Sequence, residues 1–251
     1  MLRRLTLLLL VVLATPAAFA RGNLKELTVP LKFVPQEGVH ASTADLPPAL
    51  LDLTVELRVE DARKLPDLLV IGKGTGGDDK PFPIHADRDV RAFIQDTLVT
   101  VGKEWSLKLE GSPARKLTLQ IAVFSIDESN KALGSMYSAD AKLAFTLTDA
   151  QGRALASGVG AGSTHRYGRA HSPDNINEVL SDALKEAYAN VLGDQTLQTA
   201  WVSGKAAGTS GASRTVESPE ERLRKLDDLL KKGLITKEEY QQKRADILKE
   251  M

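Results

Sequence analysis

The sequence contains no cysteine, and aromatic residues make up only 5% of its 251 positions. Without cysteine the chain has no disulfide framework, no thiolate zinc site, no iron–sulfur cluster and no cysteine nucleophile. A lipid joined to the mature N-terminus through a thioether is excluded for the same reason. We therefore expect the stability of the fold to come from packing and hydrogen bonds alone.

The sequence also has no surplus of either charge. Its 33 Lys and Arg residues balance 33 Asp and Glu residues, which gives a formal net charge of +0. A protein that binds nucleic acid needs an excess of Lys and Arg on one face to neutralise phosphates. We therefore expect no nucleic-acid partner. The length predicts one domain of about 150 residues with smaller additional segments.

The most apolar run is short and lies near the N-terminus. Arg3 and Arg4 precede the apolar stretch 5–14, and Ala18-Phe19-Ala20 offers a small-x-small cleavage pattern. This pattern predicts a secretory signal peptide over residues 1–20, cleaved near Ala20. Because a membrane-spanning helix needs ~20 apolar residues, we expect a periplasmic protein without a stable membrane anchor.

Residues 21–193 predict one α+β domain. Apolar and polar residues alternate over 51–60, which is typical of a strand with one buried face. Two amphipathic helices are predicted, over 87–102 and 173–192, the second capped by Ser172. We expect a mostly antiparallel sheet of roughly four to six strands with both helices on one face. The remaining strand patterns cover 68–71, 105–109, 117–126, 137–147 and 154–167, with a hairpin turn at 149–152.

Beyond residue 193 the composition changes. Residues 203–213 are rich in Gly, Ala, Ser and Thr, so we predict a flexible linker over 194–217. Trp201 and Val202 are aromatic and apolar outliers in this segment. We expect them to pack back on the domain, and an exposed anchor for a partner is the alternative.

Residues 218–251 predict a two-helix hairpin. Ser218 with Glu221 forms a capping box, Gly233 ends the first helix, and Thr236 with Glu239 begins the second. Such a hairpin is shorter than the ~40 residues at which domains usually become stable alone, so its apolar side chains must pack against something outside it. The options are copies of itself, the α+β domain or another protein, and the alternative is a solvated helical tail without a partner. The expected partner-binding residues are Leu223, Leu226, Leu230, Leu234, Ile235, Tyr240, Ile247 and Leu248.

The glycine-rich string over 72–77 satisfies G-x-G-x-x-G. The aspartates and prolines of 78–83 follow it and cannot open the helix that would hold a phosphate. We expect a mobile surface loop here. No G-x-S-x-G elbow is present, and we expect no catalytic residue and no cofactor.

The histidines do not predict a metal site, because the spacing of His165 and His171 matches no standard ligand pattern. His165, Arg166, Tyr167 and Arg169 form a small basic and aromatic cluster. It is either an ordinary surface patch or a contact for an acidic envelope polymer or a lipid head group.

The order of motifs in the α+β domain resembles that of known envelope lipoproteins. The order of the alternating strand, Val70-Ile71-Gly72-Lys73, the glycine-rich segment, Ile84, the Asp89-Val90 helix and the 149–152 hairpin resembles the YajG family of bacterial envelope lipoproteins over about 50–192. It is similar, more loosely, to the small α/β modules of penicillin-binding-protein activator lipoproteins. The resemblance implies a non-enzymatic envelope domain. Those families carry a lipidated cysteine directly after the signal peptide, which this sequence lacks.

The C-terminal residues resemble the SHOCT module, a short C-terminal domain of many bacterial proteins. The match rests on leucines ahead of 232–236, then two acids, an aromatic residue and Ile247-Leu248. This resemblance implies oligomerisation or partner binding. We therefore expect an exported, non-catalytic envelope protein that pairs with itself or with another envelope protein. The alternative is a periplasmic auxiliary protein that binds lipid or glycan between sheet and helices.

Overall fold

The structure is a computed structural model, and it describes residues 24–36, 46–76, 79–109, 114–131, 133–206, 240, 241 and 244. Residues 1–206 and 207–251 form two separate compact units. The predicted signal peptide and most of the predicted hairpin lie outside the described residues, although Tyr240, Gln241 and Arg244 are helical. Within the described residues no helix is long and apolar enough to cross a membrane.

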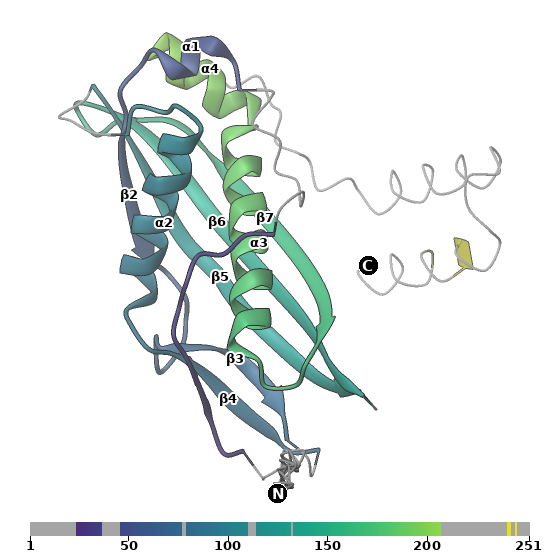
Figure 1. Cartoon of the computed structure of the whole chain (residues 1–251). Helices are drawn as coiled ribbons and strands as arrows, with labels where there is room; N and C mark the ends of the chain where they lie inside the picture. The colour runs from purple at the N-terminus through teal and green to yellow at the C-terminus, as the bar shows by residue number, and fades with distance from the viewer. Residues whose placement is uncertain are drawn as a thin grey trace, which may run out of the picture. The chain divides into compact units, whose positions relative to one another are not determined.

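A seven-stranded mixed sheet forms the centre of the first unit (Figure 1). Its order is β1-β4-β3-β5-β6-β7, and β2 pairs with the same strand, β5, as β3 does. The long β5–β6 and β6–β7 ladders are antiparallel, as is β3–β4, whereas β1–β4, β2–β5 and β3–β5 are parallel. The strands are β1 (Leu27–Val29), β2 (Glu56–Asp61), β3 (Val70–Thr75), β4 (Pro81–Ala86), β5 (Arg115–Lys131), β6 (Gly134–Asp149) and β7 (Ala154–Gly168).

Four helices accompany the sheet in this unit: α1 (Pro48–Leu51), α2 (Val90–Glu104), α3 (Pro173–Leu192) and α4 (Gln195–Ser203). The two long helices, α2 and α3, cover the same face of the sheet (Figure 1). Ser172 caps α3, as predicted, by accepting a hydrogen bond from the amide of Asn175. The predicted α+β class, with its two helices on one face, is confirmed. The sheet has seven strands where four to six were expected, and it is mixed, because β1–β4, β2–β5 and β3–β5 are parallel.

The α3 helix lies unusually close to the edge strand β7. A Cβ atom built on Gly162 would lie 2.2 Å from the carbonyl oxygen of Ala183, and one on Gly160 would lie 2.3 Å from that of Ala187. Both alanines are fully buried. The two glycines therefore let the helix backbone rest directly on the strand backbone.

Helix side chains cover the free edges of the sheet. Glu186 of α3 accepts a hydrogen bond from the amide of Ser163 at 3.0 Å, and Asn190 donates to the carbonyl of Ala161 at 2.7 Å. On the opposite side, Gln95 of α2 accepts from the amide of Val59 at 2.7 Å and donates to a second β2 carbonyl. Exposed strand edges invite pairing with other chains, so these side chains protect the sheet.

An extended segment, residues 30–36, crosses the outer side of α3 (Figure 1). Its amides at Lys32, Val34 and Gln36 donate to Asn177, Ser181 and Asp182 at 3.1, 2.9 and 2.9 Å. These three helix side chains are buried beneath the segment. Burial raises the pKa of Asp182, against the opposing effects of the Gln36 amide and of Lys185 and Arg166.

One predicted strand is shorter than expected, and another is absent. The predicted strand over 51–60 begins only at Glu56, because α1 occupies Pro48–Leu51 and Pro48 suits the first turn of a helix. The predicted strand over 105–109 is also wrong: Ser106 has a φ of 62°, and the only pairing is an isolated bridge between Thr54 and Lys108. The residues alternate between buried and exposed without forming a strand.

The predicted surface loop over 72–77 is instead mainly strand β3. Its glycines serve close packing, since a Cβ atom on Gly72 would lie 1.9 Å from the carbonyl oxygen of Ile126 on β5. Two strands, β1 at the edge of the sheet and β4 beside it, were not predicted. The prolines at 81 and 83 argue against a strand in the sequence.

The predicted linker begins too early, because α4 occupies Gln195–Ser203 and the first unit extends to Ala206. Asp194 caps this helix by accepting from the amide of Leu197. Trp201 packs back on the domain with no exposed surface, as expected, while Val202 remains 43% exposed.

The close contact between α3 and β7 is tested by Gly162→Ala. The new methyl group would overlap the α3 backbone, so we expect a loss of ~2 kcal/mol in the free energy of unfolding, measured by urea denaturation. Ala161→Ser, at the neighbouring exposed position, should change it by less than ~0.5 kcal/mol. Equal effects of the two substitutions would contradict this packing.

The burial of Asp182 beneath the extended segment 30–36 predicts that the stability of the fold depends on pH. Burial raises the pKa of Asp182 in the folded state above the usual 3.8 of the unfolded chain. The charged carboxylate therefore lowers the free energy of unfolding at pH values above the raised pKa. This loss disappears below about pH 4, where the carboxyl is protonated in both states. We expect Asp182→Asn, which can still accept from Gln36, to stabilise the fold at pH 7 but not at pH 3.5. Urea denaturation across this range measures it.

Asp174 provides the matched control, because it is exposed in the first turn of the same helix. Its charge favours the helix N-terminus, so Asp174→Asn should lose ~0.5 kcal/mol at pH 7. A loss of stability for Asp182→Asn at pH 7 would show that the Asp182 carboxylate stabilises the fold.

Candidate functional site

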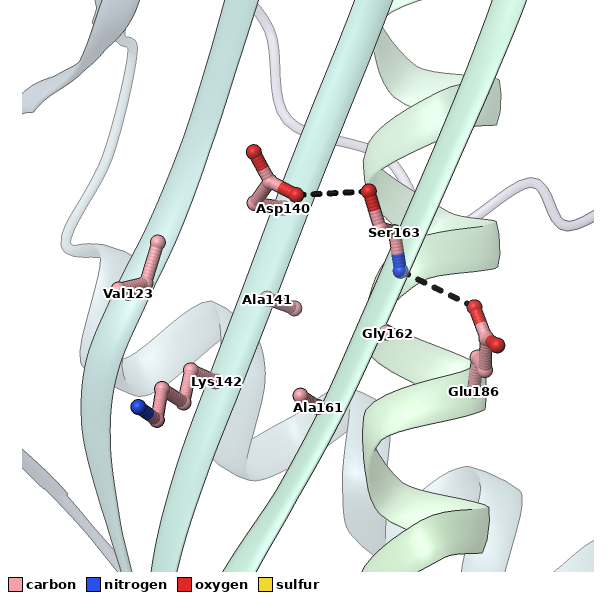
Figure 2. A pocket seen from close by; sticks show the side chains of 8 residues that line it. All are labelled: Val123, Asp140, Ala141, Lys142, Ala161, Gly162, Ser163 and Glu186. Carbon is pink, nitrogen blue, oxygen red and sulfur yellow. Dashed lines mark hydrogen bonds between the residues drawn. The ribbon is translucent and has the colours of Figure 1, made fainter. Parts of the chain in front are cut away.

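A shallow hollow of about 330 Å³ opens on the face of the sheet that α2 and α3 leave uncovered (Figure 2). The Ser163 hydroxyl on β7 donates to Asp140 on β6 at 2.7 Å, and the Ser163 amide donates to Glu186 at 3.0 Å. Figure 2 shows these groups on one side of the hollow and the amine of Lys142 on the other. The remaining lining residues are Val123, Ala141, Ala161 and Gly162.

This hollow offers hydrogen bonds to a ligand, and its lining residues include no histidine. Ser163 contacts a carboxylate, but no histidine stands among the lining residues to accept its proton during attack. The two carboxylates, the hydroxyl and the amine suit polar contacts. The arrangement therefore supports weak binding better than nucleophilic chemistry.

A second hollow, of about 390 Å³, lies where β2 ends and β3 begins along β5. Leu65, Val70 and Phe124 line its apolar part, and Lys73 forms an ion pair with Asp127 at its rim at 3.2 Å. Asp140 lines both hollows. The two hollows therefore lie side by side on the outer face of the sheet.

Arg63 fixes the connection beside the second hollow. Its side chain is 3% exposed, pairs with Asp61 at 2.7 Å and donates to the carbonyls of Leu68 and Val70 at 2.6 and 3.1 Å. Burial acts to raise the pKa of Asp61, but the hydrogen bonds and charge of Arg63 outweigh it and hold that pKa below its usual value. The buried Arg63 side chain therefore holds the loop between β2 and β3 in place.

A buried polar cluster occupies the other face of the sheet, where β7 leads into α3. Glu128 is fully buried, and its carboxylate accepts from the amide of His171 at 2.7 Å and lies 3.3 Å from the His171 imidazole Nδ1. The Tyr137 hydroxyl lies 3.1 Å from Glu128 Oε1 and 2.6 Å from the Arg169 carbonyl, and it accepts from the amide of Ser172 at 3.0 Å.

This cluster holds the β7–α3 turn in an uncommon conformation. His171 has a φ of 55°, which side chains with a Cβ atom rarely adopt, and its ring meets the edge of Phe82 at 5.4 Å. Burial and the neighbouring Glu128 raise the pKa of Tyr137, so its hydroxyl stays protonated at neutral pH. Each of these polar groups already has partners within the fold, which favours a structural role.

The basic and aromatic cluster predicted from the sequence is divided by the sheet. His165 and Tyr167 lie on the outer face and Arg169 is exposed beyond β7, whereas Arg166 forms an ion pair with Glu178 of α3. Glu128 was missed, because a single glutamate in an alternating strand gives no signal of burial. Only the pairing of β5 with β6 brings it to Tyr137.

The described residues contain no group of three or more acidic or histidine side chains that could hold a metal ion. Of the predicted partner-binding residues, Tyr240 is described, as part of a helix. The other predicted positions in the C-terminal module lie outside the described residues: Leu223, Leu226, Leu230, Leu234, Ile235, Ile247 and Leu248.

Comparison with protein families gives two matches. A family described as an uncharacterized lipoprotein matches residues 47–201, and the short C-terminal domain, SHOCT, matches residues 221–248. Both resemblances inferred from the sequence are thereby confirmed. The first match runs from the start of α1 to Trp201 of α4.

Two solved structures show partial likeness. Protein XCC0632 from Xanthomonas campestris, of the DUF330 family, is 12% identical with a TM-score of 0.45, covering 69% of this chain and 96% of that one. A minor lipoprotein from Acinetobacter baumannii is 9% identical with a TM-score of 0.29, covering 60% and 93%. Neither is close enough to inform function. A search of curated proteins finds no match.

The buried cluster is tested by Tyr137→Phe. Removing the hydroxyl leaves the Ser172 amide and the Glu128 carboxylate short of a partner, so we expect a loss of ~1–3 kcal/mol in the free energy of unfolding, measured by urea denaturation. Tyr167→Phe is the matched control, since that side chain is 51% exposed. An unchanged free energy of unfolding for Tyr137→Phe would show that the hydroxyl is dispensable.

Proposed function

Because the chain belongs to the uncharacterized lipoprotein family, we propose that it is a non-catalytic protein of the bacterial envelope that assembles through its SHOCT module. The α+β unit serves as a stable body, and the C-terminal module joins it to copies of itself. The observation that carries this proposal is the division of the chain into two compact units, with the SHOCT match falling entirely in the second.

The end of helix α4 supports a boundary between the two units. The carbonyl of Ala200 accepts from the Gly204 amide, and Gly204 has a φ of 64°, the left-handed conformation that ends a helix. Residues 1–206 make one compact unit and residues 207–251 another. This division supports a C-terminal module that serves association.

The described chemistry supports a non-catalytic role. The Ser163 hydroxyl is bonded to Asp140 in an open hollow, and the Glu128 cluster is occupied by contacts within the fold. Neither matched family is described by an enzymatic activity. The domain therefore acts by binding and positioning.

The alternative is a carrier that holds lipid or glycan between sheet and helices. The side chains facing that space are closely packed: Leu143 of β6, Ile94 of α2 and Leu184 of α3 are each 0 or 1% exposed. Both described hollows involve the outer face instead. Native mass spectrometry that finds the chain free of co-purified lipid or glycan would count against the carrier function.

An N-terminal signal peptide, cleaved near Ala20, completes the proposal by delivering the chain to the periplasm. Edman sequencing or mass spectrometry of the exported protein checks this cleavage. The expected mature N-terminus is Arg21.

Assembly is tested by size-exclusion chromatography with light scattering. We expect the chain from Arg21 to Met251 to form an oligomer and a chain ending at Glu217 to be monomeric at the same concentration. The double variant Leu226→Glu, Leu230→Glu should also be monomeric, because charges would enter the apolar stripe. Gln241→Glu, at an exposed position, should leave the mass unchanged. Equal masses for all four chains would contradict assembly through this module.

A further inference from the structure

The turn between β5 and β6 exposes apolar side chains at one end of the sheet. Leu133 is 93% exposed, the largest exposure among the large apolar residues described, and Tyr167 on β7 is 51% exposed. In the β6–β7 register, Met136 faces Tyr167, and a Cβ atom on Gly134 would lie 3.0 Å from the Tyr167 hydroxyl. Figure 1 shows this turn at the end of the sheet opposite α1 and α4.

We define the tip surface as Lys131, Leu133, Met136, His165, Tyr167 and Arg169. They lie at the end of β5, in the β5–β6 turn, near the start of β6, at the end of β7 and just after it. Strand alternation places Met136, His165 and Tyr167 on the outer face of the sheet, where no helix covers them.

The tip surface is basic. Neither 129–139 nor 150–173 contains an Asp or Glu, and among the described ion pairs none involves Lys131 or Arg169. Glu128 is fully buried, and Glu178 pairs with Arg166. On the outer face Asp127 pairs with Lys73 at 3.2 Å, and Asp140 accepts from the Ser163 hydroxyl at 2.7 Å. Asp174 is exposed on the first turn of α3, outside this surface.

The turn beside the tip does not reverse this charge. Asn130 donates to the carbonyl of Gly76 at 2.8 Å, which places the β3–β4 turn alongside. The sequence places Asp78 and Asp79 against Lys80 in this turn, an excess of one negative charge against the two positive charges of Lys131 and Arg169. The excess of positive charge therefore stays with Lys131 and Arg169.

An exposed leucine, a half-exposed tyrosine and unpaired basic groups suit the boundary between water and lipid. A leucine side chain gains free energy on leaving water, tyrosine prefers the headgroup level, and basic side chains are drawn to anionic headgroups.

We propose that the tip surface docks reversibly on anionic phospholipid headgroups at a membrane surface. Leu133 enters the boundary of the acyl chains, the Tyr167 hydroxyl stays at headgroup level, and Lys131 and Arg169 contact phosphate oxygens. This contact does not rest on assembly through the SHOCT module. It adds a peripheral membrane contact to the first unit, distinct from any covalent anchor.

Co-sedimentation with vesicles tests the docking. The chain from Arg21 to Met251, which omits the apolar N-terminal run, is mixed with vesicles of phosphatidylcholine alone or with an equal part of phosphatidylglycerol. We expect binding to the anionic vesicles only, falling as salt is raised. Leu133→Ser should weaken binding on the order of tenfold, and so should Lys131→Glu combined with Arg169→Glu.

Matched controls lie on the same outer face, away from the tip. Val159→Ser removes a side chain that is 50% exposed, and Lys142→Glu reverses an exposed charge; both should keep the parent's affinity apart from the small effect of net charge. Circular dichroism confirms that each variant is folded. Equal losses for controls and tip variants, unchanged binding by the tip variants, or no binding to anionic vesicles would each overturn the proposal.

Discussion

The approach of α3 to β7 sets the geometry of the whole domain. With glycines at 160 and 162, the backbone of the helix rests on the backbone of the strand, and Ala183 and Ala187 fill the contact. At this short distance Glu186 and Asn190 reach the free edge of β7, and Thr164 donates to the carbonyl of Val179 at 2.8 Å. A bulkier strand would lift the helix and break these bonds together.

The outer side of the same helix organises the N-terminal segment. Asn177, Ser181 and Asp182 act as a row of acceptors for an extended chain, which costs little because their polar atoms are satisfied. At its start, α3 follows the turn that Glu128 and Tyr137 hold in place. One helix thus connects the sheet edge, the N-terminal segment and the buried cluster.

Features encoded locally were predictable from the sequence. Ser172 and Asp89 cap helices through neighbouring amides, and Gly152 takes a φ of 77° in the predicted hairpin turn. Features that depend on distant partners were not. Residues 105–109 alternate in polarity without a neighbouring strand along their length. The sequence of β3 resembles a loop because it is rich in glycine, and these glycines allow close contacts with distant residues, Gly72 with Ile126 of β5 and Gly74 with Phe82 of β4. The tip surface unites segments about 30 residues apart, which only the β6–β7 register brings together.

We infer that α3 and β7 form one cooperative unit with β5 and β6, on which the outlying segments depend. Native-state amide hydrogen exchange by mass spectrometry measures this directly. Peptides from β6, β7 and α3 should exchange only through global unfolding, with a single common free energy, and 30–36 should open at a lower one. Faster exchange of β7 and α3 than of β5 and β6 would show instead that the helix is an accessory to the sheet.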